Sequence, residues 1–410
     1  MRLLHTSDWH LGQQFFGHDR TAEHQLFLDW LLDTLEREAV DVLLIAGDIY
    51  DQAHPAAETQ RQFHAFLGAA RARLPRLQIV AIAGNHDSPA RLDATTPLLS
   101  ALGIDLVGLV PTADPARLLL PLRARDGSVG AWCLAVPYLR PADLPRAPAT
   151  TAAAAGEEDS YGRGVQVFYT RLHALAQRRR AAGQAIVALG HLHLQGGSTS
   201  PLSERRLVVG GAEAVEAAPL AALADYVALG HLHLAQSVGA PHVRYCGSPL
   251  PLSFTERDYP HQVLRVDLRG GRLERVEPLR VRQPVPLLRV PATPLPAAAA
   301  LEALAALPVD AEVQPGLEPF VEAQVLLDRP EPGLAVRIAQ ALAGKAVRLT
   351  RIATFRSEVS ATAAATVVSL SELEALTPLG LLSQHYRALH ATALPPELAR
   401  ALATLETAVP

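Results

Sequence analysis

Five short, largely apolar runs along the chain each end at a glycine or serine that is followed by Asp, Asn or His. Unbroken apolar runs of this length are typical of parallel strands covered on both faces, and the ligand sites of open α/β sheets lie beyond the carboxyl ends of such strands. We therefore expect the polar residues after the runs to gather at one site. The runs are 3–6, 42–46, 79–83, 185–189 and 226–229.

Between the first three runs, apolar residues recur at a spacing of three and four, which predicts amphipathic helices over 23–39 and 58–74. Strand and helix thus alternate in this part of the chain, which indicates a parallel, layered α/β sheet. A further helix is expected over 165–180. The Pro-rich and Ala-rich stretch 141–159 predicts a mobile loop or an insertion.

Three segments near residue 280, namely 242–246, 262–268 and 272–279, are separated by turns such as Gly270-Gly271. We expect them to be antiparallel strands that close a second sheet. The predicted fold is α/β, a two-sheet β-sandwich flanked by helices that spans residues 1–280.

Five prolines between residues 284 and 296 mark the entry into a smaller unit. The order strand, helix, strand, helix, strand then predicts a small α+β capping domain over 281–356. The Ala/Thr-rich stretch 357–366 predicts a linker, and the leucine spacing over 379–391 and 396–408 predicts two helices. Residues 357–410 are therefore expected to form a linker with C-terminal helices.

Composition limits the class and the compartment. The chain has 410 residues, of which 49% are hydrophobic and 19% charged, as in folded globular proteins. Cys133 and Cys246 are too few for a disulfide framework, and neither a signal segment nor a membrane-spanning apolar stretch is apparent. We expect a cytoplasmic protein. The net charge of −4 gives no global attraction to nucleic acid, so DNA binding would need a local surface, metals or a partner.

An ATP site of the P-loop type is excluded by the lysine content. A P-loop needs a Gly-x-x-x-x-Gly-Lys-Ser/Thr sequence, and the sole lysine lies in Ala343-Gly344-Lys345-Ala346. We expect no ATP site on this chain.

The residues that follow the five runs are oxygen and imidazole donors. No thiol is among them, which argues against a Zn–thiolate centre and for Mn²⁺, Mg²⁺, Fe or Zn in a mixed N/O site. Two divalent ions about 3.5–4 Å apart can clamp a phosphate, and an anionic carboxylate is the natural bridge between them. Asp48 is the candidate bridge. Asp8, His10 and a later histidine would complete one metal site, and Asn85 with two later histidines the other.

His86 follows the candidate ligand Asn85 and is the candidate general acid, with Asp51 to orient it. An Asp–His pair raises the pKa of the imidazole towards neutrality, where a general acid works best and contributes roughly 10²–10⁴ in rate.

At these residues the chain resembles the calcineurin-like metallophosphoesterases, whose motifs are Asp-x-His, Gly-Asp, Gly-Asn-His-Asp/Glu, Gly-His and Gly-His-x-His, in that order. All five are present. Residues 5–13, 23–32 and 242–249 closely resemble a narrower family, the nuclease subunits of bacterial SbcCD complexes. After residue 280 the resemblance rests on the order of elements.

The resemblance implies a role for each matching residue. It assigns His86 as catalytic and implies two divalent ions, Mn²⁺ with Mg²⁺ as the alternative. This chain departs from the family at His193, a second histidine in Gly190-His191-Leu192-His193, which is a surplus candidate ligand. One metal would be held by Asp8, His10, Asp48 and His233, and the other by Asp48, Asn85, His191 and His231.

The resemblance also implies a function. It predicts a metal-dependent DNA nuclease subunit, with double-strand exonuclease and single-strand or hairpin endonuclease activity, that works with an SbcC-type ATPase in DNA repair, recombination and replication. Two copies of each subunit are implied. A stand-alone phosphodiesterase on a small nucleotide is the alternative, and a metal-free scaffold is disfavoured because every expected ligand is intact. The residues after 280 favour the nuclease, since a small-molecule enzyme needs neither a cap nor tethered helices.

Overall fold

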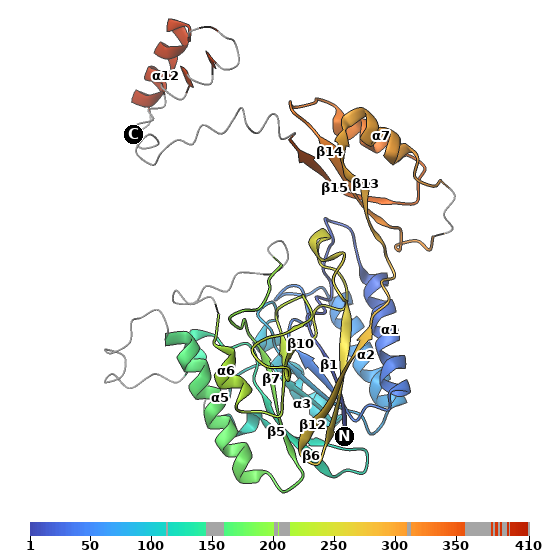
Figure 1. Cartoon of the computed structure of the whole chain (residues 1–410), viewed down its shortest axis with the longest axis vertical. Helices are drawn as coiled ribbons and strands as arrows, with labels where there is room; N and C mark the ends of the chain where they lie inside the picture. The colour runs from blue at the N-terminus through green and yellow to red at the C-terminus, as the bar shows by residue number, and fades with distance from the viewer. Residues whose placement is uncertain are drawn as a thin grey trace.

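In the computed structural model of the chain, two six-stranded sheets form a sandwich with helices on its outer faces, and a three-stranded unit follows (Figure 1). The predicted α/β sandwich is confirmed. The structure describes residues 1–111, 114–144, 160–200, 204, 214–309, 313–356, 379, 382–383, 386–387, 392 and 394–408.

The first sheet has the strand order β12-β11-β1-β2-β3-β4, and its members β1 to β4 run parallel. The helices α1 to α3 connect these parallel strands in sequence. The elements are β1 (Arg2–Thr6), α1 (Thr21–Arg37), β2 (Val42–Ala46), α2 (Ala57–Arg73), β3 (Gln78–Ile82), α3 (Pro89–Ala101), β4 (Ile104–Val107), β11 (Gln262–Arg269) and β12 (Arg272–Arg280).

The second sheet has the order β5-β6-β7-β8-β10-β9, in which β6, β7, β8 and β10 run parallel. Short 3₁₀ helices lie at η1 (Pro115–Leu118), η2 (Pro141–Asp143) and η4 (Phe254–Glu256). The other elements are β5 (Leu119–Arg123), β6 (Val129–Ala135), α5 (Ser160–Arg179), β7 (Ala185–His191), α6 (Ala217–Ala221), β8 (Tyr226–Gly230), β9 (Gln236–Ser237) and β10 (Val243–Tyr245).

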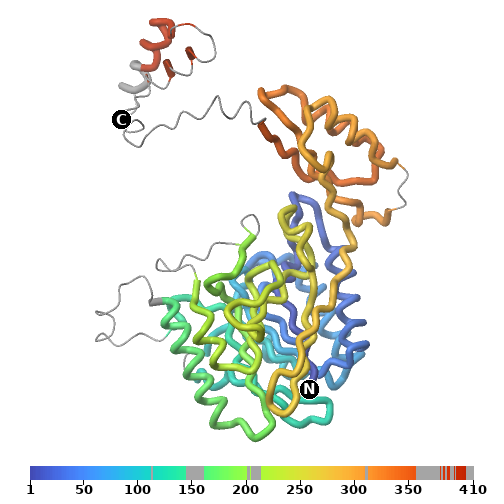
Figure 2. Tube along the Cα trace, viewed as in Figure 1, coloured from blue at the N-terminus to red at the C-terminus, as the bar shows by residue number. Residues whose placement is uncertain are grey.

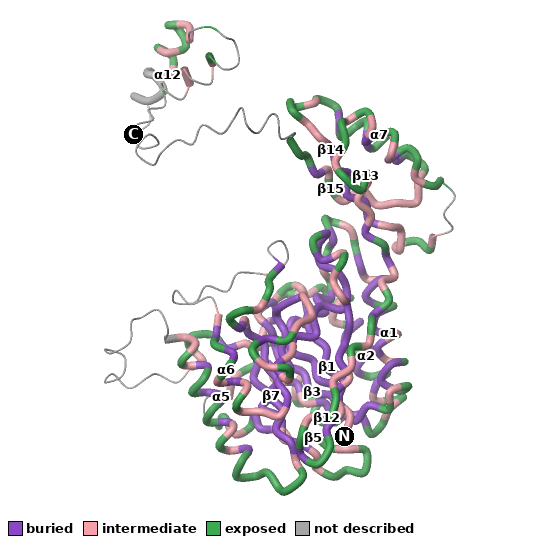
Figure 3. Tube along the Cα trace, in the orientation of Figure 1, coloured by how far each residue is buried: buried purple, intermediate pink, exposed green. Residues whose placement is uncertain are grey.

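Both faces of the central strands are buried, as the unbroken apolar runs predict (Figure 3). On β2, Leu43 and Ile45 pack in the cluster that contains residues of α1, α2 and α3, whereas Val42 and Leu44 pack in the core between the two sheets. The alternation of strand side chains between two apolar layers explains why no polar position interrupts the run.

The expectation that 242–246, 262–268 and 272–279 close a second sheet as antiparallel strands is wrong. β10 runs parallel to β8 in the second sheet. β11 and β12 are antiparallel, but β11 pairs with β1 and so both belong to the first sheet. The inner face of β11 decides this, because Leu264 and Val266 pack in the core between the sheets.

The three-stranded unit follows the sandwich in the chain (Figure 2). It consists of parallel strands in the order β13-β14-β15 and has its own apolar core. Its elements follow the expected order of strand, helix, strand, helix, strand. They are β13 (Leu287–Pro296), α7 (Ala297–Ala305), β14 (Phe320–Leu326), α8 (Leu334–Ala341) and β15 (Arg348–Phe355).

Several expectations fall wholly or partly outside the described residues. These are most of the loop 141–159, the linker 357–366 and most of the helix 379–391. The second C-terminal helix is described as α12 (Pro396–Ala408). Among the described residues, no helix is long and apolar enough to cross a membrane.

Candidate metal centre

The carboxyl ends of β1, β2, β3, β7 and β8 lie together and carry the residues that the sequence singled out. The loops after β1 and β2 are hydrogen-bonded to each other: the amide of Asp8 donates to Gly47 O at 3.0 Å, and the amide of His10 donates to Asp48 O at 3.1 Å. These backbone bonds fix the Asp8–His10 loop beside Asp48.

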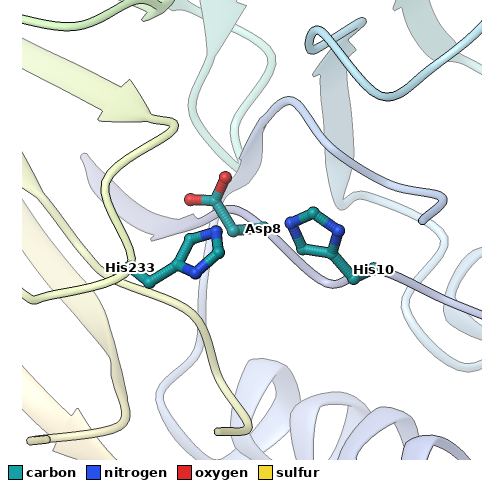
Figure 4. A group of neighbouring side chains, drawn as sticks. All are labelled: Asp8, His10 and His233. Carbon is teal, nitrogen blue, oxygen red and sulfur yellow. The ribbon is translucent and has the colours of Figure 1, made fainter. Parts of the chain in front are cut away.

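The structure brings Asp8, His10 and His233 together, with one donor atom of each within 4.8 Å of the others (Figure 4). Asp8 lies between the two imidazole rings in this view. The same spacing holds for the groups Asp8–Asp48–His191 and His10–Asp48–His86. Asp48 is thus shared between two of the groups, as a bridging carboxylate would be.

The remaining expected ligands meet at Asn85. The side-chain oxygen of Asn85 lies 2.9 Å from Nε2 of His191 and 3.1 Å from Nδ1 of His231. The surplus histidine, His193, is only partly buried, and its ring centroid lies 6.0 Å from that of His231. His193 is therefore close to this half of the centre.

Backbone strain is concentrated at the centre. Six non-glycine residues in the described part of the chain have positive φ, and four of them are expected ligands: Asp8, His10, Asp48 and His231, at 54°, 46°, 47° and 103°. Residues other than glycine rarely adopt a positive φ. Such backbone conformations cost about 1–3 kcal/mol each and cluster at functional sites. The surrounding fold holds these four residues in strained positions.

Glycines precede the expected ligands because a side chain at these positions would collide with its neighbours. A Cβ on Gly84 would collide with the carboxylate and the amide nitrogen of Asp48, and a Cβ on Gly47 would collide with the ring of His191. Gly47 also has a φ of +89°. The Gly-Asp and Gly-Asn-His motifs therefore need glycine because the two loops approach each other too closely for a side chain.

Charges in the centre compensate one another. Burial raises the pKa of Asp8. The pKa of Asp48 lies well below its usual value, because the charges of His191, His10 and His86 outweigh its burial. Conversely, His191 and His233 have pKa values of about 9 despite their burial, because Asp48 acts on His191 and Glu256 on His233.

The donor set fits divalent cations. Nε2 of His10 is buried and has no hydrogen-bond partner in the structure, although buried polar atoms are nearly always paired. All the donors are carboxylate, amide or imidazole groups, which suits Mn²⁺, Mg²⁺, Fe or Zn. A cation at this position would give the orphaned nitrogen of His10 its partner.

His86 and Asp51 lie beside this cluster. The amide of His86 donates to Asp48 Oδ1 at 2.8 Å, and Nδ1 of its ring lies 2.8 Å from the main-chain oxygen of Asp51. The Asp51 carboxylate lies 3.2 Å from Nδ1 of His10. Asp51 therefore holds the His86 ring through its main chain, and its carboxylate contacts His10.

Sequence reasoning missed Asp87, although the residue closes the Gly-Asn-His-Asp motif. Its carboxylate accepts from the amides of Ile49, Tyr50 and Gly84, at 3.2, 2.9 and 2.8 Å. Burial and the nearby charge of Asp48 raise the pKa of Asp87 to about 6. Asp87 thus joins the loop after β2 to the loop after β3.

Glu256 was also missed. Its carboxylate lies 2.8 Å from Nδ1 of His233 and is fully buried. No sequence spacing indicated this, because Glu256 comes 23 residues after His233 on the separate helix η4.

Comparisons with known proteins identify the family of this chain. A family model described as calcineurin-like phosphoesterase matches residues 1–235, and one described as type 5 capsule protein repressor C-terminal domain matches residues 283–389. The chain is 40% identical to the SbcD subunit of the SbcCD nuclease of Rhodobacter capsulatus over 89% of this chain and 90% of the relative. Relatives of the same name in Escherichia coli K12 and Bacillus subtilis are each 38% identical. The Escherichia coli match covers 70% of this chain and 71% of the relative. The Bacillus subtilis match covers 66% of this chain and 67% of the relative.

Proposed function

This chain belongs to the calcineurin-like phosphoesterases and, within them, to the family of SbcD subunits of the SbcCD nucleases, and from this we propose that it cleaves DNA at the centre described above. It is a metal-dependent phosphodiester hydrolase. The observation that carries the proposal to these residues is the cluster of buried donors from both sheets around His10, whose Nε2 has no hydrogen-bond partner.

We propose the ligands residue by residue, with Mn²⁺ as the preferred ion. Divalent ions in such a centre polarise the phosphate and neutralise charge on the leaving oxygen. Asp48 is placed to serve both sites, since it lies in donor groups with His10 and with His191. Asp8, His10, Asp48 and His233 hold one ion, and Asp48, Asn85, His191 and His231 hold the other.

His86 is the proposed general acid. Its Nδ1 faces the main-chain oxygen of Asp51, and because a carbonyl oxygen only accepts, Nδ1 carries a hydrogen. Nε2 is then the ring nitrogen that gains and loses the catalytic proton. Asp51 thus sets the tautomer in which His86 can protonate the departing oxygen.

The proposed assembly follows from the names of the relatives, which describe one subunit of a complex. We propose an SbcC-type ATPase partner, two copies of each subunit, and both exonuclease and hairpin endonuclease activity. ATP would bind to the partner, since the sole lysine of this chain does not lie in a P-loop sequence. The proposed domains are the nuclease domain 1–280, the capping domain 281–356 and the partner-binding region 357–410.

The test is Mn²⁺-dependent cleavage of a DNA hairpin, with and without an SbcC-type ATPase and ATP. Cleavage should require metal, increase with the partner and ATP, and be abolished by Asp48→Asn, which removes the bridging charge. A small chromogenic phosphodiester is assayed in parallel. Hydrolysis of that ester without any cleavage of DNA would overturn the nuclease proposal in favour of a small-molecule phosphodiesterase.

A further inference from the structure

The loop 251–256, which ends in η4, lies between the metal centre and the β13–β15 unit. Glu256 at its end is fully buried and uses both carboxylate oxygens. Oε1 lies 2.8 Å from Nδ1 of His233, and Oε2 accepts from the amide of Leu252 at 2.7 Å. The carboxylate therefore fixes His233 and is itself fixed by its own loop.

The contact with Glu256 sets how His233 presents itself to the centre. Because an ionised carboxylate only accepts, Nδ1 of His233 carries a hydrogen, and Nε2 is left to face a cation. His233 lies beside Asp8 (Figure 4). Carboxylates that orient a histidine ligand in this way typically contribute about 10–100-fold to metal affinity.

The sandwich holds the start of the loop through two side chains. Gln13 donates to Leu252 O at 3.1 Å, and Arg20 donates to Pro251 O at 2.9 Å. Arg20 is in turn paired with Glu23 through two bonds of 2.6 and 2.7 Å, with both side chains fully buried. This end of the loop therefore has little freedom to move.

The β13–β15 unit holds the other end of the loop at Phe254, two residues before Glu256. The ring centroids of Phe254 and Phe15 lie 5.6 Å apart, and those of Phe15 and Phe320 on β14 lie 4.6 Å apart. Arg289 on β13 donates to Phe254 O at 2.8 Å and to the buried Glu322 on β14 at 3.0 Å. Arg289 of the unit thus contacts the segment that carries Glu256 directly, and Phe320 reaches it through Phe15.

We infer that Glu256 is a positioning residue for His233 and that the β13–β15 unit keeps it in place through Phe254. The chain of contacts is continuous, from Glu322 through Arg289 and Phe254 to Glu256 and the ligand. Metal affinity at the His233 site is then sensitive to a unit that contributes no proposed ligand. This inference rests on the proposed function, because it takes His233 as a metal ligand.

The first test measures Mn²⁺ binding to Glu256→Gln by calorimetry and by the electron paramagnetic resonance signal of free Mn²⁺. One site should weaken by about 10–100-fold while the other keeps its affinity, and saturating Mn²⁺ should restore hydrolysis. Glu38→Gln is the matched control, because Glu38 is a largely buried carboxylate bonded to Arg265 that contacts no expected ligand. Wild-type affinity at both sites of Glu256→Gln would overturn the inference.

The second test uses two arginines that share one partner. Arg289 and Arg351 both pair with Glu322, at 3.0 and 2.9 Å, but the structure gives only Arg289 a bond to Phe254. Arg289→Ala should weaken the same metal site several-fold, and Arg351→Ala should leave it unchanged. Equal effects of the two variants, or none from Arg289→Ala, would refute the link through Phe254. If the folded wild-type chain bound fewer than two Mn²⁺ ions, the proposed function would fail instead.

Discussion

The ring of His191 on β7 is held by the main-chain oxygen of Ala46, the last residue of β2, at 2.8 Å from Nδ1. These two strands belong to different sheets. The carbonyl accepts, so Nδ1 carries the hydrogen and Nε2 is directed at Asn85 and Asp48, 2.9 and 3.4 Å away. The packing of one sheet on the other therefore sets the orientation of a proposed ligand.

This relationship distinguishes His191 from His193, two residues later. His191→Ala should lose one metal and all detectable hydrolysis, because it removes a buried donor aimed at the centre. The hydrolysis rate of His193→Ala should fall by less than about tenfold, which is below the effect expected of a residue that orients a ligand. Steady-state hydrolysis and calorimetric metal counts on both variants check this. Equal losses would show that the second metal is misassigned.

The positions of the loops that carry the proposed ligands could be predicted because each signal is local: an apolar run and a donor immediately after it. The family resemblance that these motifs suggested is confirmed by the relatives. The sheet that β11 and β12 join was not predictable in this way. β12 has only exposed and half-buried positions, as an edge strand of either sheet would. Only the packing of β11 on β1 and the inner core decides between the two sheets.

Residues that hold the proposed ligands in place were missed for a related reason. Asp87 bonds three amides of two loops, and Glu256 reaches His233 from a separate loop. Neither contact has a fixed sequence spacing, because both depend on how loops from different strands fold over the strand ends. A carboxylate that binds the main chain or the ring of another site residue leaves no periodic signal in the sequence.

His86→Ala tests the general acid. The variant should keep its metals and its DNA affinity but lose roughly 10²–10⁴ in cleavage rate, because the proton for the departing oxygen must then come from water. Single-turnover cleavage, together with DNA binding in Ca²⁺, separates chemistry from binding. A loss of bound metal in this variant would instead make His86 a ligand, an assignment to which its place in a donor group with His10 and Asp48 gives a structural basis.

The stability of the sandwich should depend on pH through His5. Burial lowers the pKa of His5 to about 3, and its neutral ring is satisfied on both sides, by Tyr226 Oη at 3.0 Å and Leu229 O at 3.2 Å. The unfolded chain takes up this proton near pH 6.5, well before the folded chain does. The contribution of His5 is therefore complete above about pH 6.5 and is lost as the pH falls towards 3, at up to about 1.4 kcal/mol per pH unit.

Urea unfolding of metal-free protein between pH 7 and pH 5 measures this slope. Tryptophan fluorescence reports the sandwich, because all three tryptophans, Trp9, Trp30 and Trp132, lie in it. His5→Gln should show a shallower fall of the unfolding free energy than wild type. His54→Gln, which replaces an exposed histidine, is the control and should keep the wild-type slope. An unchanged slope in His5→Gln would contradict the prediction.

The C-terminal helices should dock on the proposed ATPase partner. Leu379 and Leu398 are 42% and 45% exposed, and isolated helices of roughly 12–15 residues are marginal in water, so a stripe of this kind needs a surface to cover it. A stable complex buries about 1,200–2,000 Å² in total, to which α12 and the helix expected from the sequence over 379–391 can contribute a good part. Deletion of residues 366–410 should therefore leave metal-dependent cleavage of single-stranded DNA intact but abolish ATP-stimulated cleavage and co-purification with the ATPase. The paired change Leu398→Glu with Leu402→Glu should do the same, whereas Arg400→Ala on the same helix should not. If the truncated chain binds the ATPase with unchanged affinity, the docking surface lies elsewhere on the protein.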